Sequence, residues 1–97
     1  KEGFIDVFHI SSELRLPVTL RLGMTAANLL VEEFPLAEKY MEKEDETHWI
    51  FKTEVCRYEG IGRFVLGLFE DIEIIDSPEF SQYIIEKAKK ISDKIQN

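Results

Sequence analysis

The stretch PVTLRLGMTAANLLVEEFP, residues 17–35, describes one strand followed at once by one helix. Its first half alternates apolar and polar residues, which is the period of a half-buried strand. The inward positions of that strand are Val18, Leu20 and Leu22. Gly23 ends the strand, and Thr25 suits the N-cap of a helix over residues 25–34. Pro35 closes the helix, because the residue before a proline avoids the α region.

Further toward the C-terminus, the sequence predicts a hairpin. Residues 37–43 are a weak, charged strand candidate, and residues 44–47 (EDET) form a polar turn. Residues 48–57 then alternate apolar and polar side chains on a stronger strand. The charges of the first strand suit an edge position, where they discourage aggregation.

A second helix and a short strand follow the hairpin. The helix, predicted over residues 61–69, is so apolar that it should be nearly buried. Residues 72–75 (IEII) form the strand, and Ser77 with Pro78 gives the N-cap and first residue of a last helix. The lysines of that helix gather near its C-terminus, where they complement the helix dipole. Its apolar residues recur at helical spacing, at Phe80, Ile84, Ala88, Ile91 and Ile95.

The element order is therefore β-α-β-β-α-β with an additional C-terminal helix, which predicts an α+β, ferredoxin-like fold. We expect a four-stranded antiparallel sheet with the helices at 25–34 and 61–69 on one face. The residues expected on that face are Val18, Leu20, Trp49, Phe51 and Ile74, with Leu30, Phe64 and Leu68 packed against them. Residues 1–10 are interpreted as the end of an upstream domain, and residues 11–17 (SSELRLP) as a linker stiffened by Pro17.

Composition limits the class of protein. The 97 residues are 44% apolar and 11% aromatic, which favours one packed domain over a disordered segment. No run approaches the ~20 apolar residues of a membrane span, and no signal-peptide pattern appears, so we expect a cytoplasmic protein without membrane contact. The net charge of −7 opposes a large phosphate-binding face, so we expect no direct binding of duplex DNA by this chain.

Few residues suggest catalysis or metal binding. His9 and His48 lie far apart in the sequence with no carboxylate at ligand spacing, so we expect solvated or capping histidines. Cys56 has no recognisable base as a partner and is expected to be a small buried strand residue. Residues 42–46 lack the alternating ligands and central glycine of a calcium loop, and we interpret them as a solvated turn. The sequence therefore predicts no enzyme, no catalytic residue, no metal site and no cofactor.

The stretch GIGRFVLGL, residues 60–68, carries the strongest functional signal. Gly60 and Gly62 are placed at the start of the second helix, where free N–H groups can hold an anion. Arg63 is expected in that first turn and is the one basic residue between positions 58 and 86. Two interpretations stay open: an anion or effector contact, or glycines that permit close packing beside an arginine paired with a carboxylate. The carboxylates considered for that pair include Glu59 and Glu70.

Three passages resemble the C-terminal portion of WYL-domain transcriptional regulators. They are FIDVFHI (residues 4–10), PVTLRLGMTAANLLVEEFP (17–35) and GIGRFVLGLFEDIEIIDSPEFSQYI (60–84). The resemblance spans roughly residues 4–88 and is most specific from Gly60 to Tyr83. In that family a helix-turn-helix domain binds DNA, a small Sm-like WYL β-barrel senses a signal, and a C-terminal extension (the WCX domain) of ferredoxin-like fold follows.

The resemblance implies a bacterial regulatory domain without catalytic activity. Residues 1–16 would be the tail of the upstream WYL barrel plus a linker, and residues 17–97 the ferredoxin-like regulatory domain. The implied partners are a second copy in a homodimer and the upstream WYL and helix-turn-helix domains of the same chain. The alternative is a domain that senses a small anionic effector or a short single-stranded nucleic acid near Arg63.

Two departures from the family limit what can be carried over. The chain has no helix-turn-helix, so DNA binding is not assigned to it. It also lacks the Trp-Tyr-Leu signature that names the family, since the strand that holds its one tryptophan reads HWIF at residues 48–51. The effector-binding residues of the WYL barrel therefore have no counterpart here.

Overall fold

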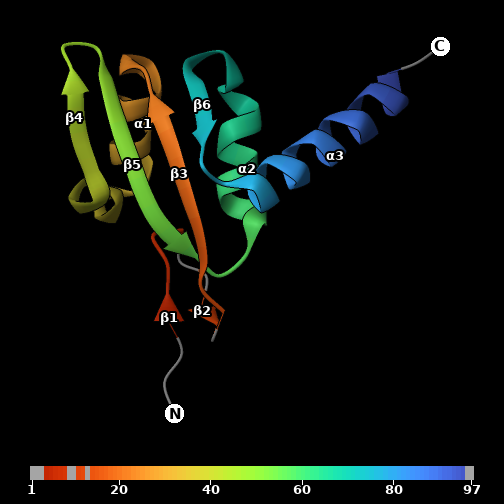
Figure 1. Cartoon of the computed structure of the whole chain (residues 1–97), viewed down its shortest axis with the longest axis horizontal. Helices are drawn as coiled ribbons and strands as arrows, with labels where there is room; N and C mark the ends of the chain where they lie inside the picture. Colours follow the sequence, from red (N-terminus) through yellow and green to blue (C-terminus); the bar gives the residue numbers. More distant parts are fainter. Residues whose placement is uncertain (1–3, 9–10, 13, 96–97) are drawn as a thin grey trace.

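A computed structural model describes residues 4–8, 11–12 and 14–95 of the chain. Four strands form an antiparallel sheet in the order β4-β5-β3-β6, with β3 inside the sheet and β4 at one edge (Figure 1). These strands are β3 (Leu16–Leu22), β4 (Met41–Asp45), β5 (His48–Val55) and β6 (Ile72–Ile75). A separate two-stranded ladder pairs β1 (Phe4–Ile5) with β2 (Ser11–Ser12).

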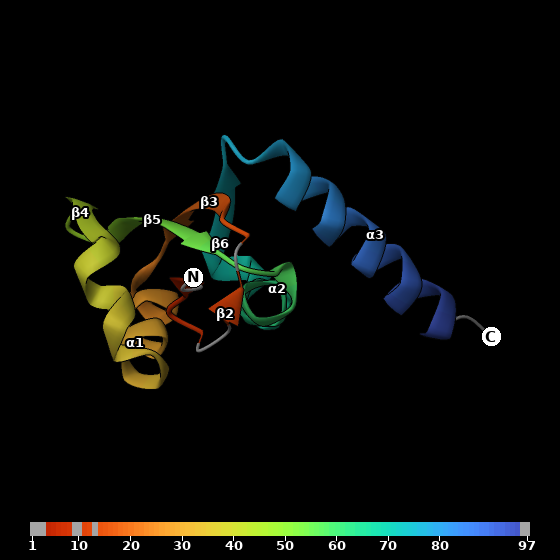
Figure 2. The same cartoon turned by 90° about the horizontal axis from the view of Figure 1, so that it is seen from below.

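Two helices cover one face of this sheet, and a third extends away from it (Figures 1 and 2). They are α1 (Met24–Glu33), α2 (Tyr58–Gly67) and α3 (Pro78–Ile95). Two 3-10 helices, η1 (Pro35–Tyr40) and η2 (Phe69–Asp71), connect α1 to β4 and α2 to β6. The predicted α+β class, with a four-stranded antiparallel sheet and a C-terminal helix, is confirmed. No helix among the described residues is long and apolar enough to cross a membrane.

The strand register explains how the sheet builds the core. Leu20 of β3 lies opposite Phe51 of β5 on one side and Ile74 of β6 on the other. Residues paired in this way point to the same face of an antiparallel sheet. Leu20 and Phe51 are fully buried there, so this is the face beneath the helices. The other expected residues of this face, Val18 and Trp49, and the expected helix residues Leu30, Phe64 and Leu68 all belong to the core or pack against it.

The hairpin begins later than the sequence predicted. The strand expected over residues 37–43 is wrong for its first half, because residues 35–40 form the 3-10 helix η1 and the strand is β4. Pro35 has a fixed φ that suits the start of η1. The helical turn of η1 then places the side chain of Ala37 in the core, where it is fully buried. The polar turn is correspondingly shorter and occupies residues 46–47, where the Thr47 amide donates to the Asp45 carboxylate at 2.9 Å.

The N-terminus of α1 is capped by a distant residue rather than by Thr25. Gly23 occupies the N-cap position, and Thr25 lies within the helix. The amide of Ala26 donates to the Asp71 carboxylate at 2.8 Å, while the Gly23 amide donates to the Asp71 carbonyl at 2.9 Å. A Cβ at Gly23 would overlap the Asp71 carboxylate, so the glycine permits this close approach. A long-range contact between η2 and α1 therefore replaces the predicted local cap.

The segment that leads into the sheet is part of the core. Val7 and Phe8 are buried in the same cluster as the sheet residues. The buried Asp6 carboxylate accepts hydrogen bonds from the Phe8 amide and from the Cys56 amide, each at 2.9 Å. Parts of the expected linker form strands, since Ser11–Ser12 are β2 and Pro17 lies inside β3. Part of the interpreted upstream tail, including His9, lies outside the described residues.

The connection from β6 to α3 is fixed by Ser77. Its hydroxyl accepts from the Thr19 amide of β3 at 3.0 Å and donates to the Ile75 carbonyl at 2.8 Å. The helix starts at Pro78, as predicted, and Phe80 is fully buried. Farther along α3 the exposure rises, to 48% at Ile91 and 69% at Ile95. The predicted apolar face of this helix therefore meets the domain only through its first turns.

We predict that Asp71→Ala lowers the free energy of unfolding by about 1 kcal/mol, the usual effect of losing a helix N-cap. The neighbouring exposed residue provides the control, since Glu70→Ala removes a charge from η2 without touching the α1 amides. Urea denaturation followed by circular dichroism measures both variants. Equal losses for the two variants would contradict the capping role of Asp71.

Candidate functional site

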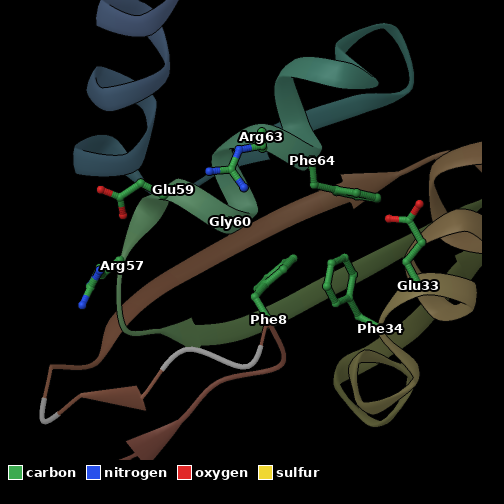
Figure 3. A pocket seen from close by; sticks show the side chains of 8 residues that line it. All are labelled: Phe8, Glu33, Phe34, Arg57, Glu59, Gly60, Arg63 and Phe64. Atoms are coloured by element: carbon green, nitrogen blue, oxygen red, sulfur yellow. The ribbon is translucent and has the colours of Figure 1, made fainter.

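Two of the three predicted site residues line one pocket, and the third does not. Gly60 and Arg63 border an open pocket of ≈ 700 Å³ between α1, α2 and the N-terminal segment that contains Phe8 (Figure 3). Gly62 lies on the other side of α2, where it faces Tyr83 of α3. The structure therefore separates the two glycines that the sequence placed at one site.

The predicted helix start is also wrong, and this changes the role of Arg63. Helix α2 begins at Tyr58, with Arg57 at the N-cap position, so Arg63 lies in the second turn. The ring of Tyr58 packs against Phe80 and Tyr83, with centroid distances of 5.1 and 5.3 Å, and this packing extends the helix toward its N-terminus. Only the first turn of a helix has free N–H groups, so the Gly62 amide is not available to an anion.

Both glycines serve close packing, as the second interpretation proposed. A Cβ added at Gly62 would lie 2.8 Å from Cε2 of Tyr83, which is closer than side-chain carbons approach. A Cβ added at Gly60 would lie 3.2 Å from Cβ of Phe8. Gly62 thus lets α3 lie close to α2, and Gly60 lets the N-terminal segment do the same on the opposite side.

The second half of that interpretation, an ion pair for Arg63, is not supported. Among the described residues, no carboxylate lies within 4.0 Å of the guanidinium of Arg63 or of Arg57. Both arginines are exposed at the pocket. Burial raises the pKa of Tyr83, the charge of Glu59 raises it further, and the positive charge of Arg63 opposes that rise. Two guanidinium groups are therefore free to meet a ligand.

Three phenylalanines form the apolar part of the pocket, and each comes from a different segment. Phe8 belongs to the N-terminal segment, Phe34 follows α1, and Phe64 lies on α2 (Figure 3). The rings of Phe8 and Phe34 are tilted against each other at a centroid distance of 4.7 Å. The sequence reasoning missed Phe8, Phe34 and Arg57 as site residues, because nothing in their spacing shows that three separate segments meet.

Charged residues of both signs border these rings. Arg57, Glu59 and Arg63 come from the start and second turn of α2, and Glu33 comes from the end of α1. All four are exposed. The pocket therefore offers cationic, anionic and aromatic groups side by side, an arrangement suited to binding.

The other residues considered for chemistry lie elsewhere. His48 pairs with Asp45 at 3.1 Å on the hairpin, where the Thr47 amide and His48 lower the pKa of the Asp45 carboxyl. The acidic stretch 42–46 is exposed, as predicted, but residues 42–45 lie in strand β4, so the predicted turn is wrong for most of this stretch. No group of three or more histidine, cysteine or acidic side chains suited to a metal occurs among residues 4–8, 11–12 and 14–95.

Cys56 is buried, as predicted, although it lies one residue beyond the end of β5. Burial raises the pKa of its thiol, and the nearby charge of Asp6 raises it further. A raised pKa keeps the sulfur protonated at neutral pH, and the thiol is the unreactive form. The environment of Cys56 therefore opposes a role as a nucleophile.

We predict that a thiol reagent at neutral pH labels Cys56 in the native chain about a hundredfold or more slowly than in guanidinium, because reaction requires both opening and deprotonation. The time course of labelling measures both states. Comparable rates in the two states would show that the thiol is accessible and would contradict its packing in the core.

Comparison with known families identifies the chain. The family model of the WCX domain matches residues 14–92, which include β3 to β6, α1, α2 and most of α3. The Phe8 side of the pocket precedes this span. Comparison with curated proteins and with solved structures finds no match. Since the matched span covers most of the sequence, the chain belongs to the WCX domain family.

Proposed function

We propose that this chain is a non-catalytic regulatory domain of a bacterial WYL-type transcriptional regulator. The WCX match over residues 14–92 carries the proposal, because WCX domains are associated with such regulators. The WYL barrel and the helix-turn-helix would precede it in the same polypeptide, with residues 1–16 as the barrel tail and linker and residues 17–97 as the regulatory domain. The buried Val7 and Phe8 support a firm junction between the two parts.

The sheet connections support a ferredoxin-like fold. Strands β3 and β4, joined through α1, both pair with β5, which lies between them. Strands β5 and β6, joined through α2, both pair with β3 in the same way. Each β-α-β unit is thus split by a strand of the other, which is the defining feature of the split βαβ arrangement.

The regulatory role includes homodimerisation through α3. Its apolar residues follow the four-three-four spacing of a coiled-coil seam, at Ile84, Ala88, Ile91 and Ile95. Ile84 is half-buried against the core, whereas Ala88, Ile91 and Ile95 are exposed. The seam extends beyond the rest of the domain, so no described part of the chain covers its far end (Figure 2). Helix-turn-helix regulators bind paired half-sites as dimers. The expected partner of the α3 seam is therefore a second copy of the same chain.

We predict that the 97-residue chain is dimeric in solution and that Ile91→Lys combined with Ile95→Lys makes it monomeric, because two charges then replace the seam. Leu36→Lys is the matched control, since Leu36 is an exposed apolar residue of η1 at 51% exposure. Light scattering after size-exclusion chromatography gives the mass of each variant. A monomeric parent chain, or a double variant that stays dimeric, would refute the role of α3.

A second function, effector sensing, is favoured by the unpaired arginines of the pocket. Arg57 and Arg63 have no ion-pair partner among the described residues, although guanidinium groups bind carboxylates and phosphates well. The ligand of such a site would be a small anionic effector or a short single-stranded nucleic acid. The negative charge of the chain supports a domain that does not itself bind duplex DNA.

We predict that Arg63→Ala leaves the melting temperature of the 97-residue chain unchanged but abolishes the response of the intact regulator in a reporter assay. No ion pair is lost, whereas a ligand contact is. Arg63→Lys should restore only part of the response, because lysine lacks the bidentate fork. Arg15→Ala, at an exposed arginine outside the pocket, is the control. A fully responsive Arg63→Ala regulator would remove the sensing function from this pocket.

A further inference from the structure

The charge balance of the pocket narrows the class of its ligand. Its lining has two arginines, Arg57 and Arg63, and two glutamates, Glu33 and Glu59. The whole chain carries a net charge of −7, so its long-range field repels anions. A pocket with equal numbers of both charges, set in an acidic protein, is therefore poorly suited to a purely anionic ligand.

The positive charge of Arg63 and the negative charge of Glu33 lie on different sides of the three phenylalanine rings. In Figure 3, Arg63 extends from α2 on one side of the phenylalanines, and the Glu33 carboxylate extends from α1 on the other. Neither residue has an ion pair among the described residues. A ligand lying over the three rings would thus meet a guanidinium at one end and a carboxylate at the other.

We propose that this pocket binds a zwitterion with an apolar, aromatic body, in the chemical class of α-amino acids and short peptides. The inference rests on the sensing function proposed above and replaces its purely anionic ligand with a zwitterion. The carboxylate of the ligand accepts paired hydrogen bonds from the Arg63 guanidinium. Its ammonium donates to Glu33, and its ring packs against Phe8, Phe34 and Phe64, with tilted or offset contacts between rings.

The position of Phe8 gives such binding a regulatory consequence. Phe8 forms one side of the pocket and follows Asp6, whose carboxylate holds the Cys56 amide next to α2. A ligand that contacts both Phe8 and α2 stabilises the packing of the N-terminal segment, residues 4–8, against the domain. Binding then favours one arrangement of the segment that connects to the upstream domains, which is how a ligand shifts a conformational equilibrium.

Four probes that differ in one group each test the ligand class. L-phenylalanine has both charges and the ring, N-acetyl-L-phenylalanine lacks the ammonium, L-phenylalaninamide lacks the carboxylate, and glycine lacks the ring. Each is titrated at millimolar concentrations into the ¹⁵N-labelled 97-residue chain, and the amide shifts of Phe8, Gly60 and Phe64 are followed by NMR. We expect L-phenylalanine to bind about tenfold or more tightly than each of the other three, because each loses one charged or aromatic contact.

Variants assign each charge to its residue. Arg63→Gln should weaken L-phenylalanine about tenfold and leave phenylalaninamide unchanged, since the amide has no carboxylate to lose. Glu33→Gln should weaken L-phenylalanine and leave the N-acetyl compound unchanged. Lys52→Gln, at an exposed site on β5 outside the pocket, should change nothing. The spectrum of each free variant shows that it is folded.

Three results would overturn the inference. Equal affinity for N-acetyl-L-phenylalanine and L-phenylalanine would show that the pocket takes an anion, and a short oligothymidine that shifts the same amides would show the same. Absence of any shift with L-phenylalanine would reject the ligand class outright. None of these three results decides the sensing function itself, which depends separately on the reporter response of Arg63→Ala.

Discussion

The fold depends on β3, the strand that pairs along both of its edges. Leu20, at its centre, has no exposed surface and lies between Phe51 and Ile74 on the buried face. Because β5 and β6 both pair with β3, α1 and α2 come to lie side by side on the same face (Figure 1). The candidate pocket is a consequence of this arrangement, since it lies where the end of α1 approaches the start of α2.

The entering segment completes that pocket and is held by buried polar bonds. The Asp6 carboxylate is only 2% exposed and accepts two backbone amides, one from its own segment and one from Cys56. A buried carboxylate is tolerated when its oxygens are hydrogen-bonded in this way. Phe8 then reaches the pocket beside Gly60, whose missing side chain leaves room for it. Phe8 precedes the WCX match, which begins at residue 14, but it is part of the same packed unit.

Helix α3 is stabilised differently from α1 and α2. Phe80 anchors its first turn, and the ring of Tyr83 packs against Tyr58 at the start of α2. Beyond these contacts, the helix is supported mainly by local effects, such as the lysines near its C-terminus that complement the dipole. This apolar seam, on a helix with little tertiary support, is the basis of the proposed homodimer.

Local sequence patterns predicted the four strands of the main sheet, the three α-helices and the buried face. Alternation in residues 18–22 and 48–55, together with Pro35 and Pro78, was enough to predict the strands, the end of α1 and the start of α3. These features depend on short-range sterics and on hydrophobic periodicity, both of which act within one element. The resemblance to WYL-type regulators was likewise present in the order of the segments, and the WCX match confirmed its C-terminal part.

The helix caps, the start of α2 and the lining of the pocket could not be predicted locally, because they depend on contacts between residues far apart in the chain. Asp71 caps α1 from 45 positions beyond Ala26, so the predicted Thr25 cap was wrong. Tyr58 packs against α3, and α2 begins at Tyr58 rather than at the predicted residue 61. Arg63 therefore lies in the second turn of the helix and not in the first. The candidate site was half predicted: Gly60 and Arg63 line the pocket, whereas Phe8, Phe34 and Glu33 reach it from other segments. Such a meeting of segments depends on how the helices pack across the sheet, and a local sequence pattern does not encode it.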